Sequence, residues 1–365
     1  MGHAKLSPSA AERWMTCPGS VHLVDVHSIV SRGGAAANRG TAIHTLCELA
    51  LTKDHDCEQY IDTTLEGIRI DAEMAAIGQT YVNFVSTARG DKFYEQRVSV
   101  EHIIDDCWGT ADCVICSDGR LVIADLKTGF KRVDAIENKQ LLIYALGAYQ
   151  KFDWIYDFSE ITLVIVQPTL DHIGTWTISA DDLLAFRDEL LAAKDRIINQ
   201  HDLFVMSEKG CEWCPAKFVC PEHIAIAHDA AKVDFADIMA EDSNALTYWL
   251  EKLPALKNFI SSIEDEAYTR LLSGCTIPNY QLGTAAKRRA WSDEKALLRF
   301  VNEHGLQSVF LKEVLVSPSQ ADKLKLDPKL LEELTKFVEY TEAKAPVVRK
   351  QSNPAGSAAA DFKSI

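Results

Sequence analysis

Apolar residues recur every three or four positions through long segments of this chain. Such spacing puts the apolar side chains on one face of a helix. It predicts helices over residues 35–51, 71–88, 137–150 and 181–200. Residues 7–15 are typical of a capped first helical turn, and residues 224–272 are predicted to be mostly helical.

Shorter segments with the composition and alternation of strands lie between these helices. They cover residues 92–100, 108–116, 121–127, 161–167 and 174–178. The segment Ser117-Asp118-Gly119-Arg120 predicts a turn that joins the second and third strands into a hairpin. The predicted fold class is therefore α/β: a mixed central sheet of about five strands flanked by helices, followed by a mostly helical C-terminal region.

Charged residues interrupt the apolar pattern of this hairpin. Both faces of strand 121–127 begin apolar, as in a strand buried on two sides, and Asp125 and Lys127 share one of these faces. Asp112 interrupts the preceding strand, and the hairpin brings it close to Asp125. One interpretation is a buried ion pair that holds the hairpin together. The other is a site where two carboxylates bind Mg²⁺ or Mn²⁺ for phosphodiester hydrolysis, with the lysine stabilising negative charge.

Other polar residues are candidates for the same site. Gln140 and Tyr144 are one turn apart on the helix after the Asp-x-Lys strand, so they face the same way. His44 lies on the helix over residues 35–51, and Glu95 lies on the strand before the hairpin. Each also has an ordinary structural interpretation, as a surface residue or a helix-packing residue.

Taken in chain order, these residues resemble the motifs of the PD-(D/E)XK nuclease superfamily: His44, Gly109-Thr110-Ala111-Asp112, Asp125-Leu126-Lys127 and Gln140-x-x-x-Tyr144. Within it the pattern is similar to the RecB-like exonucleases, which include the AddB-type and CRISPR-associated iron–sulfur nucleases. The segments 93–98 and 124–129 are also similar to a phage- and prophage-encoded family of RecB-like proteins. The resemblance covers residues 7–225 and is weaker beyond them.

The resemblance implies a restriction-endonuclease-like core and a role for each matched residue. Asp112 and Asp125 would bind the metal, with Asp125 standing where many relatives have Glu. His44 would be a further ligand, and Glu95 is an additional candidate for a second metal position. Lys127 would be the catalytic lysine. The DNA or phosphate side of the site would be lined by Gln140 and Tyr144.

Three of the ten cysteines are spaced like metal ligands: Cys211, Cys214 and Cys220. A Cys₄ site needs a fourth thiolate, and Cys17, which like Cys220 precedes a proline, is the best candidate. The resemblance implies a [4Fe-4S] cluster, and Zn²⁺ is the alternative. Its expected role is to attach the first helix to the end of the nuclease core.

The net charge of −15 requires that any contact with DNA be local. The candidate phosphate contacts are Lys131, Arg132, Lys287, Arg288 and Arg289, although such runs are also typical of solvated surface. The chain lacks an apolar run of the ~20 residues that a membrane span needs. Its first residues lack the layout of a signal peptide. A cytoplasmic protein without membrane contact is therefore expected.

We expect a metal-dependent DNA exonuclease that acts on single-stranded DNA or duplex ends in phage replication, recombination or end processing. The alternatives are a single-strand- or structure-specific endonuclease, and a non-catalytic DNA-binding recombination partner. A phage recombinase or a single-strand-binding protein is the corresponding protein partner. The expected organisation is a nuclease domain over residues 1–225, a helical region over 226–345 and a disordered tail over 346–365, which is rich in Ala, Ser and Pro.

Overall fold

The computed structural model of the chain describes residues 4–29, 35–232, 243–283, 288–291, 294–307, 326–341 and 347–350. The chain forms two compact units, Met1–Ile263 and Glu264–Ile365, which are described separately. The segment predicted to form a nuclease domain lies within the first unit.

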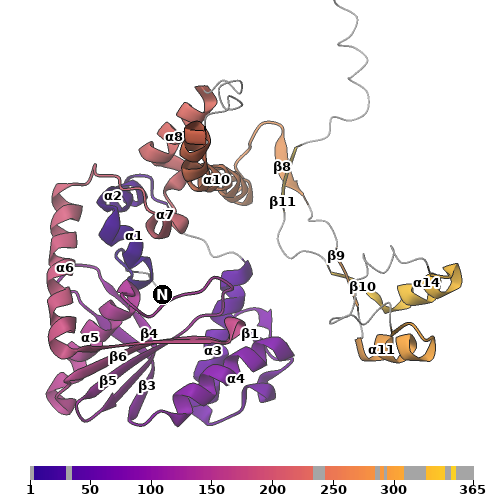
Figure 1. Ribbon diagram of the computed structural model, residues 1–365, viewed down its shortest axis with the longest axis horizontal. Coiled ribbons are helices and arrows are strands. Elements are labelled where there is room, and N and C mark those ends of the chain that lie inside the picture. Colours follow the sequence, from indigo (N-terminus) through magenta and orange to yellow (C-terminus); the bar gives the residue numbers. More distant parts are fainter. Residues whose placement is uncertain are drawn as a thin grey trace, which may run out of the picture. The chain divides into compact units, whose positions relative to one another are not determined.

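The first unit alternates helices and strands along the chain (Figure 1). Its helices are α1 (Ala11–Thr16), α2 (Pro18–Val26), α3 (Ala35–Lys53), α4 (Ala72–Thr87), α5 (Lys139–Tyr156), α6 (Ala180–Asn199), α7 (Glu208–Glu212), α8 (Pro221–Lys232) and α10 (Ser243–Leu272), the last of which crosses into the second unit. Its strands are β1 (Thr64–Leu65), β2 (Ile68–Arg69), β3 (Asp91–Ser99), β4 (Trp108–Ser117), β5 (Arg120–Leu126), β6 (Glu160–Gln167) and β7 (His172–Ser179). Short 3₁₀ turns occupy Pro8–Ala10, Cys57–Tyr60, Pro168–Leu170 and Lys217–Val219.

The five longer strands form one sheet in the order β3-β4-β5-β6-β7. β5 and β6 are parallel, and every other neighbouring pair is antiparallel. The predicted mixed sheet with flanking helices is thus confirmed, and each strand matches its predicted range to within two residues at either end.

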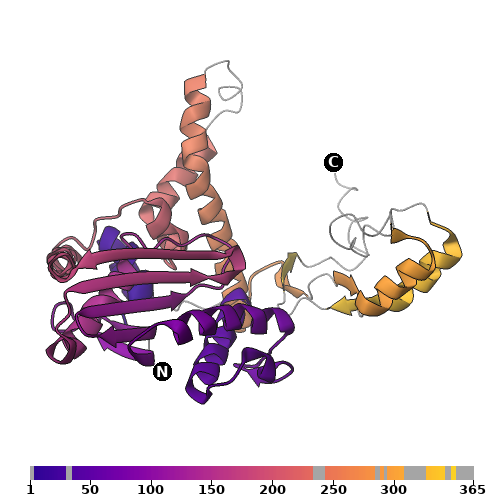
Figure 2. The same ribbon diagram turned by 60° about the horizontal axis from the view of Figure 1, so that its bottom comes forward.

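Helices cover both faces of the sheet, as Figure 2 shows for α3 and α4 on one of them. Alternation along β5 divides the core: Ile123 packs with residues of α5 and α6, whereas Ala124 packs with residues of α3 and α4. β6 is buried on both faces from Ile161 to Gln167. The polar residues that follow the apolar part of β5 are therefore held at the edge of a rigid two-sided core.

Side-chain caps explain where the helices beside the sheet begin. The Asn138 side chain accepts a hydrogen bond from the backbone N–H of Leu141 at the start of α5, and Ser179 and Asp182 form a capping box at the start of α6. α5 continues six residues past its predicted end and stops at Asp157, which adopts a left-handed conformation with φ of 46°. Within the predicted helical stretch 224–272, residues 233–242 lie outside the described part of the chain.

The second unit contains α11 (Glu294–Glu303), α14 (Pro328–Leu334), a 3₁₀ turn at Thr335–Phe337 and four short strands: β8 (Tyr280–Gly283), β9 (Arg288–Trp291), β10 (Val338–Thr341) and β11 (Val347–Lys350). β8 pairs with β11 and β9 pairs with β10. A small apolar cluster holds the helices together through Leu297, Phe300, Val301 and Leu334. The tail over residues 346–365 was predicted to be disordered, but Val347–Lys350 forms β11. The other residues of this tail are not among those that the structure describes. Among the described helices of both units, none has the length and apolar character that a membrane crossing requires.

Candidate active site and cysteine cavity

Strand register brings three acidic residues into one row. Cys113 on β4 pairs with Tyr94 on β3 and with Ala124 on β5. On each of the three strands the next position in the same direction is acidic, so the row consists of Glu95, Asp112 and Asp125. Three carboxylates from neighbouring strands therefore meet at the end of the buried part of the sheet.

His44 completes a cluster with two of these carboxylates. Its Nδ1 lies 3.1 Å from Oδ1 of Asp112, while the other carboxylate oxygen of Asp112 accepts a 2.7 Å hydrogen bond from the backbone N–H of Leu126. One ligand atom from each of His44, Glu95 and Asp112 lies within 4.8 Å of the others. A nitrogen and two carboxylate oxygens at this spacing form a donor set suited to a divalent cation.

Glu95 reaches this cluster through an unusual backbone conformation. Its φ of 43° lies in the left-handed region, within an otherwise extended strand. Non-glycine residues rarely adopt this conformation, and such residues are concentrated at functional sites. The deviation interrupts the pairing of β3 with β4 at the position opposite Asp112.

The Asp-x-Lys pair is held by residues of α5. The Nζ of Lys127 lies 2.7 Å from Oδ2 of Asp125 and donates a 3.0 Å hydrogen bond to Oε1 of Gln140. The amide nitrogen of Gln140 in turn lies within hydrogen-bond distance (3.2 Å) of Asp125 Oδ1 and of the Tyr144 hydroxyl. The side chain of Asp125 is only 3% exposed, whereas that of Lys127 is 26% exposed. The lysine is thus fixed in position and remains accessible from solvent.

The electrostatics of the cluster follow from its burial and excess of carboxylates. Burial would lower the pKa of His44, but the adjacent Asp112 prevails and raises it to about 9. Burial raises the pKa of Glu95 to about 7, and Asp112 acts in the same direction. Burial would also raise the pKa of Asp112, but His44 and then Lys127 hold it below its usual range. A proton on His44 therefore balances part of the negative charge, as a bound cation would.

Burial and the charge of the partner also set the pKa values of Asp125 and Lys127. Burial raises the pKa of Asp125 despite the opposing effect of Lys127. Burial would lower the pKa of Lys127, but Asp125 raises it above the ordinary lysine value. Lys127 is therefore a cation at neutral pH.

The structure brings together the six residues expected at the sheet: His44, Glu95, Asp112, Asp125, Lys127 and Gln140, with Tyr144 directly behind Gln140. The basic residues expected to contact DNA are not part of this cluster. Lys131 is paired with Glu212 and Arg132 with Asp134. Arg288 and Arg289 lie on β9 of the second unit, and Lys287 lies outside the described residues.

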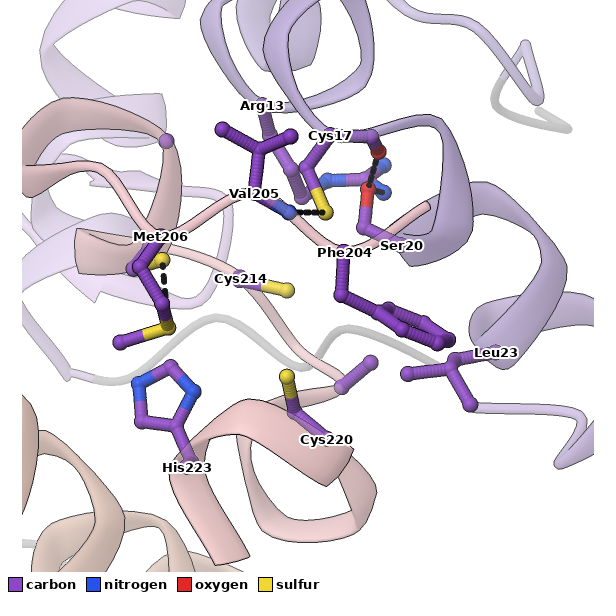
Figure 3. A pocket seen from close by; sticks show the side chains of 13 residues that line it. Arg13, Cys17, Ser20, Leu23, Phe204, Val205, Met206, Cys214, Cys220 and His223 are labelled. Atoms are coloured by element: carbon purple, nitrogen blue, oxygen red, sulfur yellow. Dashed lines mark hydrogen bonds between the residues drawn. The ribbon is translucent and has the colours of Figure 1, made fainter. Parts of the chain in front are cut away.

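The four cysteines predicted to form a metal site line one cavity of the first unit. Figure 3 shows the sulfur atoms of Cys17, Cys214 and Cys220 turned towards a common space. Cys17 comes from the start of α2, and the other three come from the segment around α7 and α8. The residues from the two ends of the unit, almost two hundred positions apart, thus meet as predicted.

Backbone N–H groups surround these sulfurs, and those of Cys17 and Cys211 accept hydrogen bonds from them. Val205 N–H reaches Cys17 and Ser207 N–H reaches Cys211, both at 3.4 Å. Backbone N–H groups also point at the sulfurs of Cys214 and Cys220, the latter from the first turn of α8. Burial raises the pKa of Cys214 to about 11, while these N–H groups act in the opposite direction. Backbone N–H groups directed at sulfur favour the thiolate form, which is the form that binds metals.

Two cavity residues were not expected from the sequence. The guanidinium of Arg13 is buried and donates a 3.0 Å hydrogen bond to Ser20. His223, in the first turn of α8, is 2% exposed, and its ring lies beside Cys220 and Met206 (Figure 3). The sequence signal for His223 is its place three residues after Cys220, a spacing that metal-ligand patterns often use.

The family model described as "Protein of unknown function (DUF2800)" matches residues 3–354. The chain therefore belongs to this family. A solved structure titled "Crystal structure of SSO0001" is 14% identical, and the match covers 60% of this chain and 88% of that chain. Its TM-score is 0.30, which is too low to support any conclusion about fold or activity.

Proposed function

We propose that the chain is a metal-dependent deoxyribonuclease of the PD-(D/E)XK type that hydrolyses phosphodiester bonds from DNA ends. The observation that carries this proposal is the arrangement of Asp125 and Lys127. The lysine contacts the buried aspartate and is held by Gln140, yet it remains accessible from solvent. An ion pair with a purely structural role would not need a third residue to orient the lysine beside a row of further carboxylates.

The residues present fit a divalent cation. His44, Glu95 and Asp112 would hold it, with Asp125 next to them in the row. Oxygen-rich sites with a histidine accommodate Mn²⁺ as well as Mg²⁺, so either ion would suit this donor set. When bound, such an ion polarises the phosphate and lowers the pKa of water, so that water can act as the nucleophile at neutral pH.

The side chains of the site would stabilise the developing charge and orient the reacting groups. In hydrolysis the water oxygen forms a bond to phosphorus, the bond from phosphorus to the leaving oxygen breaks, and the water proton ends on solvent or on the leaving group. Lys127 keeps its charge at neutral pH, so its role is to stabilise the extra negative charge on the phosphate and not to act as a base. Gln140 holds that ammonium in place, and its second contact, to Asp125, keeps both groups in one orientation.

The cysteine cavity supports a second, structural metal centre. Four cysteine sulfurs that line one cavity, two of which accept backbone N–H hydrogen bonds, are the donor set of a [4Fe-4S] cluster or of a tetrahedral Zn²⁺ site. The family resemblance favours the cluster. In either case the metal would join α1 and α2 to the segment that follows α6, so that its binding energy stabilises the fold.

The alternative that the site geometry leaves for testing is a DNA-binding protein with a nuclease fold and no activity. Its acidic row would then have no role, because carboxylates repel the phosphates of DNA. An endonuclease with the same site is the second alternative. A setting in phage replication or recombination rests on the family resemblance.

The test is digestion of DNA labelled at its ends, with linear and circular substrates, single-stranded and duplex, in Mg²⁺ or Mn²⁺. The variant is Lys127→Met, which removes the charge at nearly constant volume. The control is Lys139→Met, which removes a lysine of α5 that is paired with Glu189 away from the site. We expect Lys127→Met to lower the cleavage rate by about 10²- to 10³-fold and the control to leave it unchanged.

Equal activity in all three proteins would overturn the site assignment. Absence of cleavage by the wild type, together with retained DNA binding, would favour the non-catalytic protein. Cleavage of circular substrates would make the enzyme an endonuclease.

A further inference from the structure

His223 is a buried polar side chain without a hydrogen-bond partner. Neither of its ring nitrogens has one among the described residues, although the residue is only 2% exposed. An imidazole carries at least one N–H donor in every protonation state. A buried N–H donor of this kind is expected to have an acceptor. Its acceptor is therefore expected to be a group that binds in the cavity.

The cavity around His223 has few acceptors other than sulfur. Among the described residues, the lining is made of cysteines, apolar side chains and Met206, with Arg13 and Ser20 as the two further polar side chains. Those two are already engaged, because Arg13 donates to Ser20 and Ser20 donates to the carbonyl oxygen of Cys17. Of the polar side chains that the structure describes in this lining, the imidazole of His223 is the one whose polar atoms have no partner and can face the four sulfurs.

The backbone of His223 points in the same direction. Its N–H and that of Glu222, at the start of α8, are directed at the sulfur of Cys220. These are two of the N–H groups that a helix leaves unsatisfied in its first turn, and a thiolate there interacts favourably with the positive end of the helix. The backbone N–H and the imidazole of His223 therefore both face the cysteine cavity.

We propose that the imidazole of His223 donates an N–H hydrogen bond to a sulfur of the metal centre held by Cys17, Cys211, Cys214 and Cys220. The proposal rests on the metal centre proposed above. His223 is then a positioning residue and not a ligand, since four thiolates already complete the ligand set. Hydrogen bonds to metal-bound sulfur stabilise the charge on the thiolates, so this bond slows the loss of the metal.

The test compares the full-length wild type with His223→Leu and His223→Met, which lack a donor, and with His223→Gln, which keeps one. The control is His172→Leu on β7, because Nε2 of His172 is also buried without a partner in the described residues but does not line this cavity. Proteins purified without oxygen are analysed for bound iron and zinc and for circular dichroism. The rate at which a chelator removes the metal is then followed by absorbance.

We expect every folded variant to bind the same amount of metal as the wild type. The metal should leave about 10- to 100-fold faster from the Leu and Met variants, with partial rescue in His223→Gln and no change in the control. If the metal is iron, the reduction potential of the Leu and Met variants should also become more negative.

Unchanged release from a folded Leu or Met variant would overturn the role of His223 and leave the metal centre intact. Complete absence of metal from such a variant would also overturn it, because the imidazole would then be a ligand. A wild type without bound iron or zinc would remove the metal centre, and with it this inference. None of these results bears on cleavage by the acidic site.

Discussion

Glu95 is held in a position where its charge is unfavourable, and replacing it should stabilise the protein in the absence of metal. Its pKa is raised from 4.5 to about 7 by burial and by Asp112. One pKa unit corresponds to about 1.4 kcal/mol, so a shift from 4.5 to about 7 means that the ionised carboxylate would cost the folded state up to about 3.5 kcal/mol. Partial exposure of Glu95 reduces this, and we expect Glu95→Gln to gain about 1–3 kcal/mol at pH 8.

The pH dependence has a definite sign. Between pH 4.5 and 7 the folded chain binds a proton that the unfolded chain has released, so wild-type stability falls as the pH rises through this window. The glutamine variant lacks this loss. Its advantage should therefore be absent near pH 4, grow through the window and be complete above pH 7.

Urea unfolding with a chelator present, at pH 4.5, 6 and 8, measures this difference. Tryptophan fluorescence reports mainly on the first unit, because six of the seven tryptophans precede residue 264. The control is Glu58→Gln, an exposed residue, which should change stability little at any pH. Mn²⁺ should reverse the order, since the wild type binds it more tightly. If metal-free Glu95→Gln is no more stable than the wild type at pH 8, burial and the neighbouring Asp112 do not make the charge of Glu95 unfavourable.

Three further outcomes are expected. Cys214→Ser should lose the metal of the cysteine cavity, measured as iron and zinc per chain, whereas the exposed Cys275→Ser should retain it. Under the proposed function, Gln140→Leu should lower the DNA cleavage rate about 10-fold while leaving the melting temperature within a few degrees, because it frees Lys127 without emptying the core. Trp14→Ala should destabilise the first unit by about 3–5 kcal/mol in urea unfolding, since Trp14 is 0% exposed, while Trp154→Ala, at a position 82% exposed, should cost little.

The parts of the fold that could be predicted from the sequence are those that local patterns determine. Alternation in β5 places Asp125 and Lys127 on one face, and the hairpin turn fixes the strand that carries Asp112 opposite it. The end of α5 could not be predicted, because only tertiary contacts decide that the helix continues to Asp157.

The residues of the candidate site could be predicted because their order along the chain resembles the order of motifs in PD-(D/E)XK nucleases. The importance of Glu95 depends on register across three strands and on a left-handed backbone angle, neither of which a residue pattern contains. For His223 the sequence offers only its spacing from Cys220, whereas the lack of a partner for its ring depends on the tertiary structure. Likewise, the pairing of Lys131 with Glu212 joins positions that are far apart in the chain, so the sequence does not indicate that this lysine has an acidic partner.

The cavity that joins Cys17 to the segment ending at His223 also sets an order of events during synthesis. All five strands of the sheet and every acidic residue of the row are made before Cys211 is added to the chain. The five-stranded sheet with its acidic row is therefore synthesised before the cavity can close. A chain that stops short of Cys220 would contain the whole acidic row but only part of the sulfur set, so a metal in this cavity would mark chains whose synthesis has passed Cys220.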